Sequence, residues 1–146
     1  MLQTAAWPIG DLEDNGFAIL EYSSGVVATL HTSWTQWKNL FSLELFGLNG
    51  ALVVEGLGRS YGPESLTRHL RLPEGGVPET ASWTFEGPDE SWSLEWDAFV
   101  RAALDGEPLS PTPHDGVAVM TALDALYRSA ALREPVAVPA PLAHTR

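Results

Sequence analysis

Residues 91–106, SWSLEWDAFVRAALDG, mark the point at which the sequence changes from a strand pattern to a helix pattern. Apolar residues recur there at the spacing of one helix face, namely Trp92, Trp96, Phe99, Val100 and Ala103. Asp89 or Ser91 is a suitable N-cap residue, and Gly106 is a suitable stop. We therefore predict an amphipathic helix whose tryptophans, Trp92 and Trp96, pack into the core.

A second helix is predicted after Thr112-Pro113-His114-Asp115. This tetrapeptide supplies a capping hydroxyl, a proline at the first helical position and an acid three residues after the cap. Apolar side chains then line one face, namely Val119, Met120, Leu123, Leu126 and Ala130. The two helices together are expected to occupy residues 89–132.

The part of the chain before these helices has the pattern of short strands separated by turns. The strand-like segments are residues 13–22, 26–35, 40–47, 51–56, 66–72 and 80–86. The Asn49-Gly50 pair supplies a tight hairpin turn between two of them. We predict an α+β fold: an open, mostly antiparallel β-sheet of about six strands over residues 13–86, with the two C-terminal helices packed on one face. Residues 134–146 are expected to form a short strand, at 136–138, and a tail. The whole chain, 1–146, is expected to be a single domain.

Composition excludes several classes of partner and site. The 146 residues contain 19 acids and 8 Lys or Arg, and the net charge of -11 repels nucleic acid and anionic lipid. Cysteine is absent, so the sequence offers no disulfide, thiolate nucleophile or Cys-based zinc site. Residues 1–10 lack the regions of an export signal, and no stretch reaches the ~18 apolar residues of a membrane span. We expect a cytoplasmic protein.

The motifs that would indicate chemistry are weak. The glycine run at residues 56–62, GLGRSYG, follows a strand, but Pro63 interrupts it where a dinucleotide site requires a helix. The four histidines have no metal-binding spacing, so we expect no metal. Lys38, which is the only lysine, is expected to lie in a solvated loop.

Five residues are the candidates for contacts with a small molecule: His31, Trp34, Trp37, Arg59 and Tyr61. His31 lies in a strand between Thr29 and Ser33, and the two tryptophans flank the turn between central strands, where their rings can stack on a ligand. Arg59 and Tyr61 lie in the glycine run and can orient hydroxyls or a carboxylate. Ordinary packing or interface contacts remain the alternative for all five.

The sheet face away from the helices is predicted to be an interface. It mixes polar with apolar side chains and carries Thr29, His31, Ser33, Ser42 and Glu44. Six strands present on the order of 700 Å², which is comparable to one side of a standard protein contact. We expect a homodimer or a higher oligomer formed through this sheet.

Three segments together resemble one known family: EDNGFAILEYSSGVVATLHTSW, LELFGLNGALVVEGLGRSYGPESL and PDESWSLEWDAFVRAALDGEPLSPTPHDGVAVMTALDALYRSA. The markers are Asp14 to Gly16, the turn from Phe46-Gly47 to Asn49-Gly50, and Tyr127-Arg128-Ser129-Ala130. Over nearly its whole length the chain resembles the C-terminal domain of the Gfo/Idh/MocA oxidoreductases, the glucose-fructose oxidoreductase and inositol dehydrogenase family.

This resemblance implies a domain that lines a substrate pocket and builds an oligomer, while a separate Rossmann domain binds NAD(P). The family's catalytic lysine lies in a Glu-Lys-Pro motif, which Lys38 in Trp-Lys-Asn does not match. No catalytic or cofactor-binding residue is therefore carried over to this chain, and no cofactor is expected on it alone. The resemblance implies a substrate-binding and oligomerisation domain of a sugar or polyol oxidoreductase, present as a split subunit or a fragment that is not catalytic alone.

Two alternatives remain open. The chain could be a standalone non-catalytic scaffold, or a sugar-binding protein, that self-associates through its sheet. An independent enzyme of the cone-shaped α+β type is the other alternative, but such folds place helices before most of the sheet, whereas here the strands come first.

Overall fold

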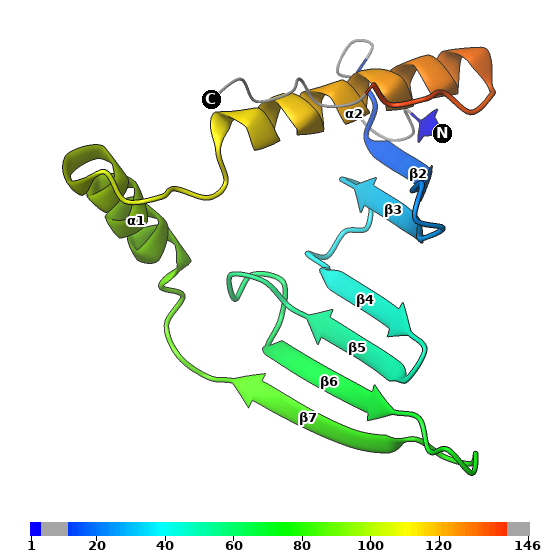
Figure 1. Cartoon of the computed structure of the whole chain (residues 1–146), viewed down its shortest axis with the longest axis vertical. Coiled ribbons are helices and arrows are strands. Elements are labelled where there is room, and N and C mark those ends of the chain that lie inside the picture. Colours follow the sequence, from blue (N-terminus) through cyan, green and yellow to red (C-terminus); the bar gives the residue numbers. More distant parts are fainter. Residues whose placement is uncertain (4–11, 140–146) are drawn as a thin grey trace. The chain divides into compact units, whose positions relative to one another are not determined.

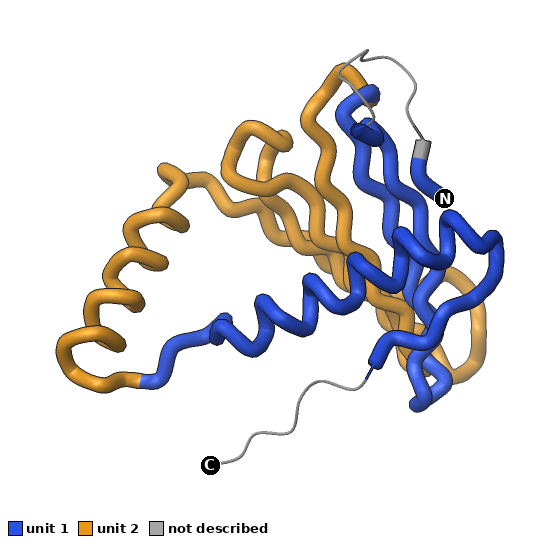
Figure 2. The backbone as a smooth tube through the Cα atoms, turned by 90° about the horizontal axis from the view of Figure 1, so that it is seen from above, with its two compact units in different colours: residues 1–35, 108–146 blue, residues 36–107 orange. Residues whose placement is uncertain are grey.

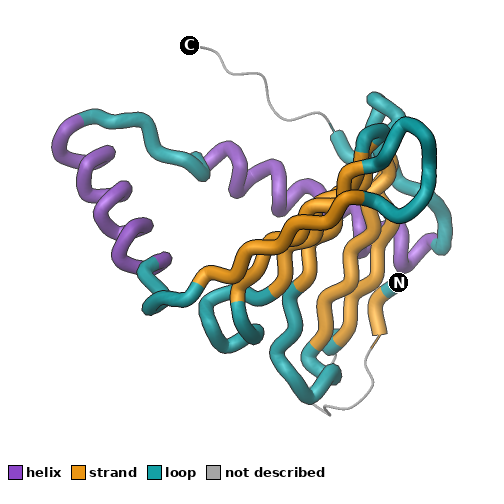
Figure 3. Tube along the Cα trace, turned by 90° about the horizontal axis from the view of Figure 1, so that it is seen from below, coloured by secondary structure: helices purple, strands orange, loops and turns teal. Residues whose placement is uncertain are grey.

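Hydrogen bonding divides the strands into two antiparallel sheets (Figure 1). The computed structural model describes residues 1–3 and 12–139. The first sheet has the order β1-β2-β3, with β1 (Leu2–Gln3), β2 (Asn15–Glu21) and β3 (Val27–Ser33). The second has the order β4-β5-β6-β7, with β4 (Ser42–Gly47), β5 (Gly50–Glu55), β6 (Glu64–Leu70) and β7 (Glu79–Phe85). The helices α1 (Ser91–Asp105) and α2 (Pro113–Leu132) come after all the strands in the sequence, and they are drawn in purple in Figure 3. The predicted α+β fold with open antiparallel strands and two later helices is confirmed.

The chain forms two compact units (Figure 2). Unit 1 consists of residues 1–35 and 108–146, and it contains β1 to β3 and α2. Unit 2 consists of residues 36–107, and it contains β4 to β7 and α1. One ladder across all strands was predicted, but the connection at residues 34–41 is longer than a hairpin turn and does not force β3 and β4 to pair. The prediction of a single domain stays a prediction.

In unit 1, the β2–β3 hairpin is closed by a turn that ends at Gly25. This glycine has φ 85°, and its amide donates to the carbonyl of Tyr22 over 2.8 Å. Where Gly16 faces Thr32 in the ladder, a Cβ atom on Gly16 would lie 3.2 Å from the Thr32 methyl group. The close approach of these two strands therefore favours a glycine at this position, since a larger residue would require the Thr32 side chain to shift.

A capping box starts α2, as predicted. The Thr112 hydroxyl accepts from the Asp115 amide, and the Asp115 carboxylate accepts from the Thr112 amide over 2.7 Å. Ala125 of this helix is 3% exposed and is the only buried apolar side chain in the described part of the chain. Farther along α2, the Tyr127 hydroxyl donates to the Glu13 carboxylate just before β2. This hydrogen bond joins the helix to the beginning of the three-stranded sheet.

A buried polar cluster links the ends of β2 and β3. Asp14 and Asn15 are 6% and 8% exposed. The Asn15 side-chain carbonyl accepts from the hydroxyls of Ser33 and Thr35 over 2.6 and 3.1 Å, and its amide donates to the Asp14 carboxylate over 2.7 Å. The Trp34 backbone amide donates to the Asp14 carbonyl over 2.9 Å. Because each buried polar atom named here has a partner, the cluster fixes the chain where it leaves β3.

In unit 2, the β4–β5 hairpin turns at residues 48–49, and Gly50 begins β5. A Cβ atom on Gly50 would meet the carbonyl oxygen of His69 in β6, so the close approach of β5 and β6 requires this glycine. The pairing register separates the sheet into a largely apolar face and a half-polar face. The apolar face carries Leu43, Leu45, Leu52, Val54, Leu66 and Trp83, whereas the half-polar face carries Ser42, Glu44, Phe46, Val53, Thr67 and Ser82.

The helix α1 corrects one prediction. Gly106 ends it in the left-handed conformation with φ 73°, as expected, but the N-cap residue is Glu90 rather than Asp89 or Ser91. Trp92 and Trp96 are 79% and 64% exposed, and no side chain of α1 is buried. Their assignment to the core was therefore wrong, because periodicity identifies an apolar helix face but not what covers it.

Two further differences from the predictions concern short segments. Residues 136–138 form no strand, although a strand was predicted there. Residues 136–138 lie between prolines, and so short a segment forms a strand only where it hydrogen-bonds to another strand. This segment pairs with none of the described strands. The two-residue strand β1 was not predicted because it is too short to show alternation. Among the described residues, no helix is long and apolar enough to cross a membrane.

Candidate functional site

The glycine loop, defined as residues 56–62, connects β5 to β6 and is held by its own backbone. Gly56 is buried and has φ 79°, and a Cβ atom there would lie 2.8 Å from the carbonyl carbon of Pro63. The Gly58 amide donates to the Glu64 carboxylate over 2.8 Å. These contacts fold the loop back onto the beginning of β6.

Arg59 takes an uncommon backbone conformation in this loop, with φ 61°. Its side chain lines an open hollow of about 430 Å³, together with Gly62, Pro63, Thr84, Phe85 and Glu86. The pairing of Glu64 with Phe85 in the β6–β7 ladder places the end of β7 opposite the loop. The hollow is therefore built by one loop and one strand end of the same unit.

An ionised carboxylate lies beside the loop. Asp89, just before α1, accepts from the Ser91 amide over 3.0 Å, and a Cβ atom on Gly58 would lie 3.2 Å from Oδ2 of Asp89. Hydrogen bonds from Ser91 hold the pKa of Asp89 below its ordinary value, and the positive charge of Arg59 acts in the same direction. The charges of Asp89 and Arg59 thus favour each other next to the hollow.

The side chains around the hollow suit a molecule with several hydroxyl groups. Arg59 is a donor, Glu86 is an acceptor when ionised, and the Thr84 hydroxyl can do both. Phe85 adds an apolar ring to the same lining. The loop leads into β6 rather than into a helix, so it lacks the helix N-terminus on which a dinucleotide phosphate would bind. The residues present therefore fit a small polar ligand and do not fit a dinucleotide.

The five predicted contact residues are divided between the two units. Arg59 and Tyr61 both lie in the glycine loop, but of these two only Arg59 lines the hollow. Trp37 precedes β4 with φ 56° and is 73% exposed. These three residues belong to unit 2, whereas His31 and Trp34 belong to unit 1.

Each of the two candidates in unit 1 has its own surroundings. The ring of His31 in β3 stacks on Phe17 in β2, with centroids 4.4 Å apart and planes 14° from parallel. This stack gives His31 a packing partner across the hairpin. Trp34 follows β3 with its backbone held by the buried polar cluster, while its indole is 79% exposed. Trp34 is thus an exposed aromatic side chain on a fixed backbone.

The sequence analysis missed Thr84, Phe85 and Glu86 as lining residues. No local motif marks them, since they lie more than twenty residues after Arg59. The pairing of β6 with β7 was the one feature from which these residues could have been predicted, because its register sets which residues of β7 lie opposite the glycine loop. The predicted segments, 66–72 and 80–86, had nearly the right ends. Paired end to end they would place residue 66 opposite residue 86, whereas Leu66 pairs with Trp83 in the structure, three residues earlier.

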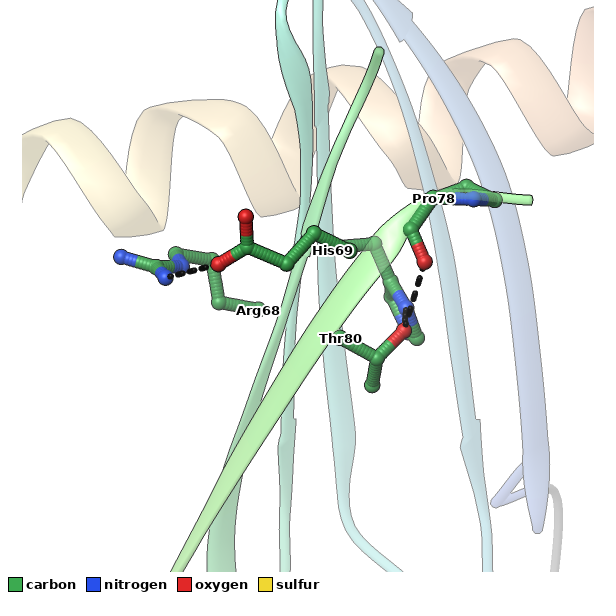
Figure 4. Close-up of polar contacts among 5 residues, drawn as sticks. Arg68, His69, Pro78 and Thr80 are labelled. Carbon is green, nitrogen blue, oxygen red and sulfur yellow. Dashed lines mark hydrogen bonds and ion pairs between the residues drawn. The ribbon is translucent and has the colours of Figure 1, made fainter. Parts of the chain in front are cut away.

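Polar side chains also gather on β6 and β7 at the other end of the sheet (Figure 4). Arg68 Nη2 lies 3.4 Å from Oε1 of Glu79, and the Arg68 guanidinium lies 5.8 Å from the centre of the Trp83 ring. His69 Nδ1 lies 2.9 Å from the Thr80 hydroxyl, which donates to the Pro78 carbonyl over 3.4 Å. Within the described ranges, no three His, Asp or Glu side chains are grouped so as to hold a metal ion.

The comparison with protein families identifies the chain. Residues 2–138 match the model described as the oxidoreductase family, C-terminal alpha/beta domain, of the Gfo/Idh/MocA group. The chain belongs to this family. The matched range confirms the resemblance that the sequence markers indicated, and it corresponds to the family's C-terminal domain. Searches of curated proteins and of solved structures returned no match.

Proposed function

We propose that this chain is the substrate-binding and oligomerisation domain of a cytoplasmic, NAD(P)-dependent sugar or polyol oxidoreductase. The hollow at the glycine loop carries the proposal, because a donor (Arg59), an acceptor (Glu86) and an aromatic residue (Phe85) are among its lining residues in a domain of the oxidoreductase family. The nucleotide and the catalytic lysine would come from a Rossmann domain, on a partner subunit or elsewhere in a longer chain. The residues of this chain would bind and orient the substrate.

In the proposed complex, Arg59 donates to neighbouring hydroxyls or to a carboxylate of the substrate. Glu86 accepts from a hydroxyl on the same molecule, and Thr84 completes the set. The Phe85 ring contacts the C–H face of the sugar, which is a common way for an aromatic side chain to contact a carbohydrate. Asp89 helps to hold Arg59, since the two charges attract each other.

A binding titration tests the substrate part of the proposal. The chain would be titrated by calorimetry with glucose, myo-inositol and gluconate, and again as Arg59→Gln. Arg101→Gln is the matched control, because Arg101 is an exposed arginine of the same unit that pairs with Glu107 over 3.3 Å, and it does not line the hollow. We expect binding of at least one compound that Arg59→Gln weakens roughly ten-fold, as for loss of a charged hydrogen bond, and that Arg101→Gln preserves. Absence of binding across the panel contradicts the substrate role and favours the scaffold alternative.

The oligomerisation part rests on the apolar face of the four-stranded sheet. Leu43, Leu45 and Leu52 on this face are 47%, 54% and 38% exposed. Sequence analysis expected the opposite, half-polar face of Ser42 and Glu44 to form the interface. We favour the apolar face because removing apolar area from water drives association.

Variants at two neighbouring residues of β5 test the two faces of the sheet separately. Leu52 pairs with Leu45 on the apolar face, whereas Val53 pairs with Glu44 on the half-polar face. We expect light scattering to give at least a dimer for the parent chain and for Val53→Lys, and a monomer for Leu52→Lys. A monomeric parent chain at micromolar concentration refutes self-association. If Val53→Lys is monomeric while Leu52→Lys remains a dimer, the interface is the half-polar face instead.

A further inference from the structure

A second hollow lies at the end of the four-stranded sheet away from the glycine loop. It is an open hollow of about 260 Å³, and it lies where the β4–β5 turn meets the connection between β6 and β7. Its lining combines apolar side chains with two basic ones: Phe46, Leu48, Ala51, Pro78, His69 and Arg71. Pro63 precedes β6 and lines the first hollow, whereas Arg71 follows β6 and lines the second. At about 3.3 Å per residue, this strand separates the two hollows by roughly 25 Å.

The pairing register places three of the lining residues, Phe46, Ala51 and His69, on one side of the sheet. Phe46 pairs with Ala51, Ala51 pairs with His69, and His69 pairs with Thr80. Directly paired residues of an antiparallel ladder project to the same face, so the Phe46 ring and the His69 imidazole share the half-polar face. An apolar surface and a basic group are thus next to each other at this end of the sheet.

The two basic residues have neutral hydrogen-bond partners, through the backbone of Arg71 and through the ring of His69. The Arg71 backbone amide donates to the Asn49 carbonyl over 2.9 Å, which ties this residue to the β4–β5 turn. The described chain shows ion pairs for Arg68, Arg101 and Arg128, but it places no carboxylate within ion-pair distance of Arg71. As Figure 4 shows, Nδ1 of His69 contacts the Thr80 hydroxyl, which itself donates to the Pro78 carbonyl. Nδ1 is therefore the donor to Thr80, and Nε2 of the neutral ring is an acceptor, so the charge that attracts an acidic ligand here is that of Arg71.

We propose that this second hollow binds a small organic carboxylate with an aromatic or other apolar body. A carboxylate is the natural partner for a guanidinium that lacks an acidic neighbour, since the planar groups form two parallel hydrogen bonds. The apolar body covers Phe46, Leu48 and Pro78. The volume lies just below the usual 300–1,000 Å³ of ligand pockets, which sets the size at about one ring with its acid group. This site is independent of the proposed sugar site.

Benzoate and its uncharged analogue benzamide test the proposal with the full chain. Each would be titrated into labelled protein while backbone amide resonances are followed by NMR. We expect benzoate to shift the amides of Gly47, Gly50 and Arg71, and benzamide to bind at least roughly ten-fold more weakly, because it lacks the charge. Inorganic phosphate is the third probe, and we expect it to bind more weakly than benzoate because it has no apolar body.

Two variants localise the binding. Arg71→Gln removes the proposed charge from an exposed position, so the fold should be retained, and we expect it to weaken benzoate binding roughly ten-fold. Arg128→Gln makes the same charge change on α2, outside the hollow, and should leave benzoate binding unchanged. The proposal is overturned if benzoate and benzamide bind alike, if phosphate binds as tightly as benzoate, or if both variants have the same effect. It is also overturned if benzoate shifts only the amides of the glycine loop.

Discussion

Replacing Asn15 by Ala should destabilise unit 1 more than any other single asparagine change in the described chain. The side chain makes three hydrogen bonds while 8% exposed: two are accepted from the hydroxyls of Ser33 and Thr35, and one is donated to the Asp14 carboxylate. A neutral hydrogen bond contributes about 1 kcal/mol net, and one to a charged group about 1.5–3 kcal/mol. Because Ser33 and Thr35 also lie within 3.1 Å of each other, their hydroxyls keep a partner, and we expect a loss of about 3 kcal/mol.

Urea unfolding followed by far-UV circular dichroism measures this loss. With a slope of about 2 kcal/mol per molar urea, the midpoint for unit 1 should fall by about 1.5 M. Asn39→Ala is the control, because Asn39 is exposed in the connection before β4 and should change the free energy of unfolding by less than about 0.5 kcal/mol. Asn15→Asp distinguishes the effect of the lost hydrogen bonds from the effect of the lost side-chain volume. It keeps the size of the side chain but removes the hydrogen-bond donor and places a second carboxylate beside Asp14. If Asn15→Ala and Asn39→Ala have equal midpoints, the cluster does not stabilise the fold.

Two other features give direct tests. Gly50→Ala should disrupt the β5–β6 pairing and broaden its amide resonances, because the added methyl group meets the His69 carbonyl. Gly47→Ala, whose methyl group would lie 3.7 Å from the nearest backbone oxygen, should be tolerated, and equal spectra for the two variants would refute this. Tyr127 should be the last tyrosine to ionise in an ultraviolet titration, because its hydrogen bond to Glu13 raises the pKa of Tyr127 and lowers that of Glu13, and Glu13→Gln should return the tyrosine toward its ordinary pKa. The hydrogen bond between Tyr127 and Glu13 should stabilise unit 1 most at pH values between the two ordinary pKa values. This stabilisation should be lost below pH 4.5, where Glu13 is protonated, and above pH 10, where Tyr127 is ionised. A free energy of unfolding that does not change across these two limits would contradict the contact.

Local chemistry made part of the fold predictable. The capping box of Thr112 and Asp115 and the glycine stop at Gly106 depend only on neighbours in sequence, so the beginning of α2 and the end of α1 followed from the residues alone. The Asn49-Gly50 pair located the β4–β5 hairpin for the same reason, although the turn itself is one residue earlier than that pair. Such features require no knowledge of the rest of the chain.

The remaining features depend on which strands pair and in which register, and on which apolar faces are covered by other elements. Neither can be read from neighbouring residues in a single sequence. The glycine loop was recognised, and Arg59 with it, but the rest of the hollow comes from β7 through the ladder register. Trp92 and Trp96 share an apolar helix face, yet the amphipathic pattern is the same whether that face is covered or exposed. The second hollow also depends on pairing, since Phe46 and His69 are brought together only across β5.

The division of the chain into a continuous and a discontinuous unit sets an order for folding during synthesis. Each strand of unit 2 pairs with its neighbour in sequence, so this unit has low contact order and can fold once residue 107 has left the ribosome. Unit 1 has to wait for α2, because the hydrogen bond between Tyr127 and Glu13 spans 114 residues. Until that helix is made, the sheet of β1 to β3 lacks this contact, and its apolar side chains stay open to association in the nascent protein.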